Sequence, residues 1–177
     1  FDVWNKTVLG SSFDTFYTDR YLTVPDQRPL AKAVSGAPFD AIFVIVNAKT
    51  YGGGGIYNYY GLGTSDNALS KEVFVHEFGH SFAGLADEYY NSEVAYINMY
   101  PEGVEPWEPN ITTLMDFESK WKDMMEVEGV GLYEGAAYVP KGIYRPAPDC
   151  RMHTNKAPAF CPVCQRAIDR MIDYYTK

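Results

Sequence analysis

The sequence predicts an α+β fold, because strand patterns and helix patterns occupy separate stretches of a 177-residue chain. The run AIFVIVNA at 41–48 has the unbroken β-branched and aromatic content of a buried strand. Residues 66–83 are apolar on nearly all sides of a helix, and residues 162–175 are apolar along one stripe. We therefore expect a twisted mixed β-sheet, a buried helix and an amphipathic C-terminal helix. The length suits a single domain over residues 1–177, and a start at Phe1 without an initiator Met indicates a piece of a longer chain.

The first half of the chain supplies the expected sheet. Residues 22–35 should contain a short helix that ends near Gly36, and the strand at 41–48 should be central in the sheet. Four successive glycines follow at 52–55, where the lack of side chains lets the backbone turn or approach another chain closely. Residues 56–63 are then expected to form an edge strand.

The second half of the chain is expected to be mostly irregular. Gly84 is a natural end for the buried helix. The segment 89–148 is rich in loops, and only 116–125 has a short helical pattern. A long irregular segment inside a compact domain usually forms a wall of a functional site. The C-terminal helix, which Pro162 should open, closes this half of the chain.

Charge and hydropathy exclude some partners. The 23 acidic and 15 basic residues give a net charge of -8, which argues against electrostatic binding of nucleic acid or of an anionic membrane. The longest apolar run, 41–46, is far too short to cross a bilayer. We therefore expect a globular protein that binds no nucleic acid and inserts no segment into a membrane.

The predicted buried helix carries the sequence HEFGH at 76–80. Helical residues four apart share a face, so the imidazoles of His76 and His80 can reach one metal ion. Glu77 can address a water on that ion without becoming a ligand, which is the arrangement of zinc peptidases. The motif predicts Zn²⁺ as cofactor and a zinc-dependent endopeptidase, with Glu77 as general base and a protein or peptide as substrate.

A hydrolytic zinc site needs a third protein ligand and one position for water. Gly84 can turn the chain back after the helix and bring Asp87 towards the metal, so Asp87 is the favoured third ligand. Glu88 is an alternative, and Asp87 would then accept a hydrogen bond from a ligand imidazole. His153 and Glu134 are further candidates.

Six segments carry a resemblance to a known family: HEFGHSFAGLADEYY, the YGGGG run before it, EPWEPN, GLYEGAAY, YRPAPDCRM and FCPVCQ. Together they resemble the IgA-peptidase family of bacterial metalloendopeptidases over about residues 39–170. The resemblance implies a zincin fold, a secreted or cell-envelope location, and a site that contains His76, Glu77, His80 and Asp87. It does not imply that immunoglobulin is the substrate.

A looser similarity is to the metzincins. In that group the glycine and the third ligand each come one residue earlier after the second His than Gly84 and Asp87 do here. The glycine turn and the ligand are therefore kept, with a longer turn between them. Metzincins also carry a methionine turn beneath the metal, which Met152 resembles, although an ordinary core methionine is an equal interpretation.

The three cysteines lie near the C-terminus and leave several states open. A disulfide from Cys150 to Cys161 or Cys164, or simply buried thiols, is the favoured interpretation. The alternative is a structural zinc site in which these three cysteines act with His153.

Other residues suggest how a substrate could be held. A peptide could pair with the edge strand after the glycines, and Tyr89, Tyr133 or Tyr138 could stabilise an oxyanion. Asn5 and Asn110 head N-x-T sequons. Two other functions remain open: a zinc-containing binding or adhesion module without catalysis, and a zinc amidase that acts on cell-wall amides.

Overall fold

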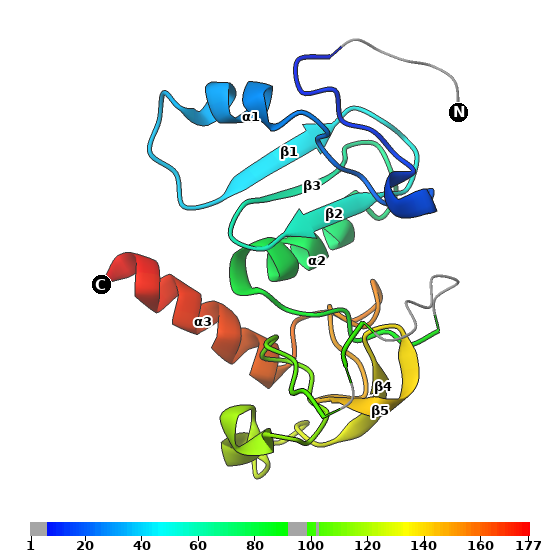
Figure 1. Ribbon diagram of the computed structural model, residues 1–177, viewed down its shortest axis with the longest axis vertical. Coiled ribbons are helices and arrows are strands. Elements are labelled where there is room, and N and C mark those ends of the chain that lie inside the picture. The colour runs from blue at the N-terminus through cyan, green and yellow to red at the C-terminus, as the bar shows by residue number, and fades with distance from the viewer. Residues whose placement is uncertain (1–6, 92–98, 102) are drawn as a thin grey trace.

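The computed structural model describes residues 7–91, 99–101 and 103–177. Figure 1 shows an upper half built on a three-stranded sheet and a lower half built on a hairpin and the C-terminal helix, with helix α2 between them. Helices and strands are both present in small separate units, so the predicted α+β class is confirmed. The elements are α1 (Gln27–Val34), β1 (Ile42–Val46), β2 (Gly53–Ile56), β3 (Tyr60–Thr64), α2 (Ser70–Ala83), β4 (Tyr133–Ala136), β5 (Val139–Arg145) and α3 (Pro162–Thr176), with short 3₁₀ turns at Thr15–Tyr17, Phe117–Ser119 and Lys122–Met124.

The upper sheet is mixed, as predicted, but its strand order differs from the prediction. The order is β1-β3-β2, with β1 and β3 parallel and β2 and β3 antiparallel. β1 is therefore an edge strand among the described strands, and the prediction that it is central was wrong. Its apolar run is buried on one face only, because Ile42 and Val44 enter the core while Ile45 is 69% exposed.

The predicted edge strand at 56–63 was also wrong. Residues 57–59 form a turn, and the residues after them enter β3, which is central and buried along its whole length. The other edge strand, opposite β1, is β2, which consists largely of the glycine run itself. Sequence patterns do not reveal such a strand, because glycines carry neither the alternation nor the β-branched side chains that predict strands.

The glycines of β2 are required by the close approach of this strand to α2. A Cβ atom at Gly53 would lie 2.7 Å from Oε1 of Glu77, and one at Gly55 would lie 2.7 Å from both the Glu77 carbonyl oxygen and Cβ of His80. No side chain fits in that space without a shift of the helix. The sequence left a turn or a close approach to another chain open for these glycines, and in the structure they approach the helix of the same chain that carries HEFGH.

Helix α2 begins at Ser70 and ends at Ala83, within the predicted stretch 66–83. Gly84 ends it, as predicted, in the left-handed conformation with φ of 62°. A Cβ atom there would lie 2.7 Å from the Trp107 ring. Both the backbone conformation and the packing therefore favour glycine at this position.

The lower half contains a hairpin that the sequence did not predict. β4 and β5 pair antiparallel around Ala137 and Tyr138, which have φ of 50° and 69°. Two-residue turns with positive φ usually contain Asn and Gly, so the sequence gives no signal for this one. The helix expected at 116–125 is replaced by two 3₁₀ turns. The C-terminal helix is confirmed, and Pro162 is its first residue.

Each half has its own hydrophobic core. The upper core joins α1 to the sheet through Leu30, Val44 and Leu62. The lower core surrounds Trp121 and Met152, both fully buried. Within the described ranges, none of the helices combines the length and the apolar composition that crossing a bilayer requires.

Candidate metal centre

The ligand atoms of three predicted residues converge at the C-terminal part of α2. Nε2 of His76 and Nε2 of His80 lie 3.0 Å apart. Oδ1 of Asp87 lies 2.9 Å from the first and 3.2 Å from the second. Three nitrogens or oxygens bound to one zinc ion at about 2.0–2.1 Å would lie about 3.3 Å apart in a tetrahedral arrangement. The side chains of this cluster are therefore almost in the positions that a shared ion requires.

The other nitrogen of each imidazole fixes the ring. Nδ1 of His76 lies 2.9 Å from the carbonyl oxygen of Arg151, and Nδ1 of His80 lies 2.6 Å from that of Leu85. A carbonyl oxygen only accepts hydrogen bonds, so each Nδ1 carries the proton and Nε2 presents a lone pair. Two lone pairs and a carboxylate oxygen in contact repel each other unless a proton or a metal ion lies between them. The donor set therefore fits a divalent cation.

When no metal is bound, the contacts with Asp87 raise the affinity of His76 and His80 for protons. Burial of His80 opposes its charge, but the negative charge of Asp87 outweighs burial and raises the pKa of His80 to about 9. Burial likewise opposes ionisation of Asp87, yet the two histidines hold its pKa well below the usual range. Protons and a metal ion would compete for these lone pairs.

Two tyrosines hold the other oxygen of Asp87. The hydroxyl of Tyr89 donates to Oδ2 at 2.9 Å, and the hydroxyl of Tyr138 donates to the same atom. Tyr138 also shares a hydrogen bond of 2.8 Å with Tyr21, and Arg20 donates to Tyr89 at 3.3 Å. With Oδ2 bound in this way, Oδ1 faces the histidines.

Tyr138 reaches Asp87 from the strained turn between β4 and β5. A non-glycine residue with positive φ costs of order 1 kcal/mol, and such residues concentrate at functional sites. The turn is held by two backbone hydrogen bonds, from the amide of Ala137 to the Asp87 carbonyl at 2.9 Å and from that of Tyr138 to the Tyr89 carbonyl at 3.0 Å. The unpredicted hairpin therefore positions a side chain of the site.

Glu77 lies beside the cluster and under the glycine strand. Glu77 borders the same cavity as His76 and His80, and the residue is 9% exposed. Burial raises the pKa of Glu77, and the neighbouring histidines only partly oppose that rise. A carboxylate with a raised pKa beside a cation site is suited to exchanging protons.

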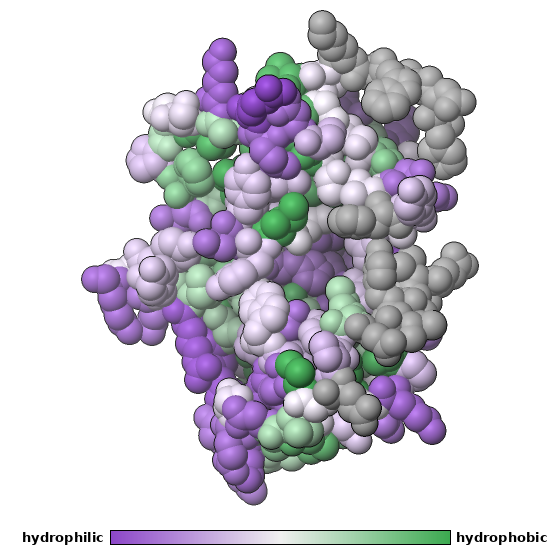
Figure 2. Space-filling model, viewed as in Figure 1, coloured by the Kyte–Doolittle hydropathy of each residue, from purple (hydrophilic) through white to green (hydrophobic). Residues whose placement is uncertain are grey.

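The cluster forms the floor of a cavity of about 710 Å³ between the two halves. Its walls include β2, Trp107 and Tyr138. Figure 2 shows a hollow with hydrophilic residues at mid-height of the molecule, between its upper and lower parts. A cleft of this size is large enough for several residues of an extended peptide.

The model of the IgA Peptidase M64 family matches residues 1–129 and 126–172, which together cover most of the chain. The chain belongs to the IgA peptidase M64 family. The resemblance found from the sequence segments is thereby confirmed, and the chain is a member of a family of proteases that act on proteins or peptides. No curated protein matches the chain.

The other candidate ligands considered from the sequence lie outside the cluster of His76, His80 and Asp87. Glu88 points into a cluster of cysteines, and Nδ1 of His153 lies 3.3 Å from Asp149. Glu134 accepts a hydrogen bond from the amide of Gly142 on the hairpin. Of the three candidate tyrosines, Tyr133 does not border the cavity, while Tyr89 and Tyr138 bind Asp87. In the described part of this M64 member, neither Glu88, His153 nor Glu134 contributes a ligand atom to the cluster of His76, His80 and Asp87.

Met152 is fully buried. A Cβ atom at Gly79, within HEFGH, would lie 2.6 Å from its sulfur. The residue before it, Arg151, supplies the carbonyl that accepts from His76. The methionine therefore packs directly against the helix that carries HEFGH.

Sequence reasoning missed Tyr21 and Arg20, which reach the site from the N-terminal segment. Nothing in their local sequence distinguishes them from other surface residues. The sequon asparagine Asn110 is fully buried and bonds to Ala86 and Glu88, so it has a structural role in the folded chain. Asn5 lies outside the described residues.

Proposed function

We propose that this M64 chain is a zinc-dependent endopeptidase with a zincin fold, in which His76, His80 and Asp87 hold the metal and Glu77 is the general base. The convergence of two imidazole lone pairs and one carboxylate oxygen, all within 3.2 Å of each other, carries the proposal. Two nitrogens and one oxygen from the protein, with a further position left for water, are the ligand set of hydrolytic zinc sites.

Each residue has a role in peptide hydrolysis. Zinc bound at this site would act as a Lewis acid that polarises the attacking water and the substrate carbonyl. Glu77, beside the ligands, accepts a proton from that water and later delivers it to the leaving amine nitrogen. Tyr89 and Tyr138 hold Asp87 so that Oδ1 stays directed at the histidines.

The edge strand β2 supports binding of an extended substrate. Among residues 7–26, the hydrogen bonds to this edge are those at Gly53, through the amide of Leu22 and the carbonyl of Arg20. Residues 53–57 border the cavity beside Glu77. A peptide that adds to the free part of this edge by backbone hydrogen bonds would pass over the metal ligands.

Substitution of the general base tests the proposal. Glu77→Gln should retain zinc, because Glu77 is not a ligand, and should lower the rate of peptide hydrolysis by about 10²–10⁴-fold or more. Zinc content and cleavage of a mixed peptide library would be measured on the same preparation. Glu72→Gln, on the first turn of the same helix and outside the cavity lining, is the matched control and should keep full activity.

Other outcomes would select other functions. Undiminished hydrolysis by Glu77→Gln would refute the mechanism. Bound zinc in the unaltered chain with no cleavage of any peptide would favour a binding module. Cleavage of cell-wall amides in the absence of peptide cleavage would favour a zinc amidase, for which the chemistry is the same.

A further inference from the structure

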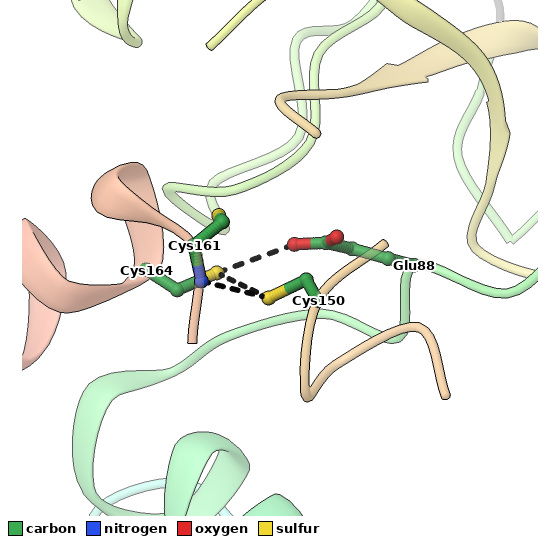
Figure 3. Close-up of side chains that lie close together, drawn as sticks. All are labelled: Glu88, Cys150, Cys161 and Cys164. Atoms are coloured by element: carbon green, nitrogen blue, oxygen red, sulfur yellow. Dashed lines mark hydrogen bonds between the residues drawn. The ribbon is translucent and has the colours of Figure 1, made fainter. Parts of the chain in front are cut away.

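A second group of ligand side chains lies in the lower core, apart from the cavity. The sulfurs of Cys150, Cys161 and Cys164 and a carboxylate oxygen of Glu88 all lie within 4.8 Å of one another. Figure 3 shows these side chains meeting from the segment after α2, from the loop before Met152 and from the start of α3. All four residues are buried, and Glu88 and Cys164 are 0% exposed.

The distances within this group fit a tetrahedral metal site. The sulfurs of Cys150 and Cys164 lie 3.7 Å apart, and Cys164 Sγ lies 3.2 Å from Glu88 Oε1. Around zinc, with Zn–S of about 2.3 Å and Zn–O of about 2.0–2.2 Å, the corresponding tetrahedral separations are about 3.8 Å between two sulfurs and about 3.6 Å between sulfur and oxygen. A disulfide needs about 2.05 Å between its sulfurs, and all three cysteines are free.

Hydrogen-bond donors and a helix N-terminus around this cluster favour negative charge on its sulfur and carboxylate atoms. The amide of Cys161 donates to the sulfur of Cys150 at 3.2 Å, and Asn110 donates to Glu88 Oε1 at 3.0 Å. Cys161 caps the N-terminus of the 15-residue helix α3, where the helix dipole is positive. The remaining oxygen of Glu88, Oε2, is buried and has no hydrogen-bond partner among the described residues. Such a group is costly in an apolar core unless a cation compensates it.

The sequence spacing agrees with this geometry. Cys161 and Cys164 are separated by two residues, which is the paired spacing of structural zinc sites. His153, which the sequence offered as the fourth ligand, is 3.3 Å from Asp149 and stacks on Tyr90 instead. Glu88 takes the fourth position.

We propose that Glu88, Cys150, Cys161 and Cys164 form a second, structural Zn²⁺ site. This site joins the chain segment after α2 to the loop at Cys150 and to α3. The residues next to it are parts of the first site: Asp87 precedes Glu88, and Arg151, which accepts from His76, follows Cys150. A metal ion at this point fixes the lower wall of the cavity.

The test uses a variant in which only the second site remains. His76→Ala combined with His80→Ala removes two ligands of the first cluster and leaves the cysteines intact. The folded double variant, purified after expression with added zinc, should retain about one zinc ion per chain by elemental analysis. Exchange for cobalt should give the near-ultraviolet band of thiolate-to-cobalt charge transfer, which carboxylate and imidazole ligands do not produce.

Two further variants identify the ligands. Cys161→Ser with Cys164→Ser, added to the double histidine variant, should remove the remaining zinc and the cobalt band. His153→Ala in the same background is the matched control and should keep both. Because the first cluster is already disabled, these results do not depend on whether the chain hydrolyses peptides.

Three results would overturn the proposal. The first is a folded double histidine variant without zinc and without the cobalt band. The second is a disulfide, seen as fewer than three titratable thiols in the denatured, unreduced protein. The third is loss of the metal in the His153→Ala control. None of these three measurements uses a cysteine variant, so each can be made even when the cysteine variants fail to fold.

Discussion

The two ligand clusters differ in exposure and in chemistry. The side chains of His76 and His80 are 14% and 17% exposed and border a cavity, whereas Glu88 and Cys164 are inaccessible. The first cluster offers nitrogens and an oxygen with room for a water and a substrate. The second offers three sulfurs and an oxygen from four buried residues that do not line the cavity. Zinc sites with an open coordination position are typical of catalysis, and closed sites with four protein ligands typically stabilise a fold.

The clusters are joined by two consecutive residues, Asp87 and Glu88. The side chain of Asp87 reaches the histidines, and that of Glu88 reaches the cysteines. Backbone hydrogen bonds hold this pair, with the Glu88 amide on the Met152 carbonyl at 2.8 Å and the Ala137 amide on the Asp87 carbonyl at 2.9 Å. A short acidic pair can therefore serve both a reactive and a structural site, and the two can be separated by mutation.

The largest effect is expected from Asp87→Ala. This change removes a proposed ligand of the open site, so peptide hydrolysis should fall to background and that site should lose its zinc. The zinc of the cysteine cluster should remain. Elemental analysis together with a peptide-cleavage assay checks both statements, and hydrolysis that persists at the original rate would exclude Asp87 as a ligand.

A smaller effect is expected from Tyr138→Phe. The ring is kept, but Asp87 loses one of the two hydroxyls that hold Oδ2. Removal of such an outer contact typically lowers metal affinity or activity by about 10–100-fold. Competition with a chelator and a peptide-cleavage assay measure these quantities. Tyr133→Phe, on the same hairpin but outside the cavity lining, should change neither.

Gly55→Ala should act through packing. The new Cβ would meet the Glu77 carbonyl and His80 Cβ at 2.7 Å, so β2 or α2 must move. Overpacking of this kind costs about 1–3 kcal/mol in the free energy of unfolding, which denaturant titration measures. Gly63→Ala is the matched control, because its Cβ would meet the Phe74 ring at an ordinary 3.4 Å. Equal destabilisation by both changes would contradict the close approach of β2 to α2.

The smallest effect is expected at the surface of the lower half. Arg166 on α3 pairs with Asp123 at 2.7 Å, and the Asp123 side chain is 69% exposed. Exposed ion pairs add little to stability, so Asp123→Ala should leave the thermal unfolding midpoint almost unchanged. A large decrease would mean that this ion pair, rather than the buried cluster, holds α3 in place.

Features set by neighbouring residues were predictable from the sequence. The spacing of His76 and His80 on a helix needs only helical geometry, and Gly84 ends that helix because of its own backbone freedom. Asp87 was favoured over Glu88 by its spacing after His80 and by the family resemblance. What separates them in the structure is the position of the cysteines and of Asn110, 22 residues further on, which no local pattern reveals.

Features set by distant packing were missed. β2 consists of glycines because α2 lies against it, and the hairpin turn uses Ala137 and Tyr138 in a conformation that these residues rarely adopt. The predicted central position of β1 was wrong for a related reason, because an apolar run does not indicate whether one or both faces of the strand are buried. Tyr21 joins the site through a contact across 117 residues.

The glycine strand also bears on how this peptidase would distinguish substrates. Because Gly54 and Gly55, beyond the pairing of Gly53 with the N-terminal segment, have no side chains, a peptide paired with them would meet only amide and carbonyl groups, which are the same for every sequence. Discrimination would then come from other walls of the cavity, such as the rings of Tyr57 and Trp107, which are tilted by 37° with their centroids 5.1 Å apart. With a substrate bound to β2 as proposed, preference for particular residues can diverge on the aromatic wall while the strand that would align the peptide backbone stays the same.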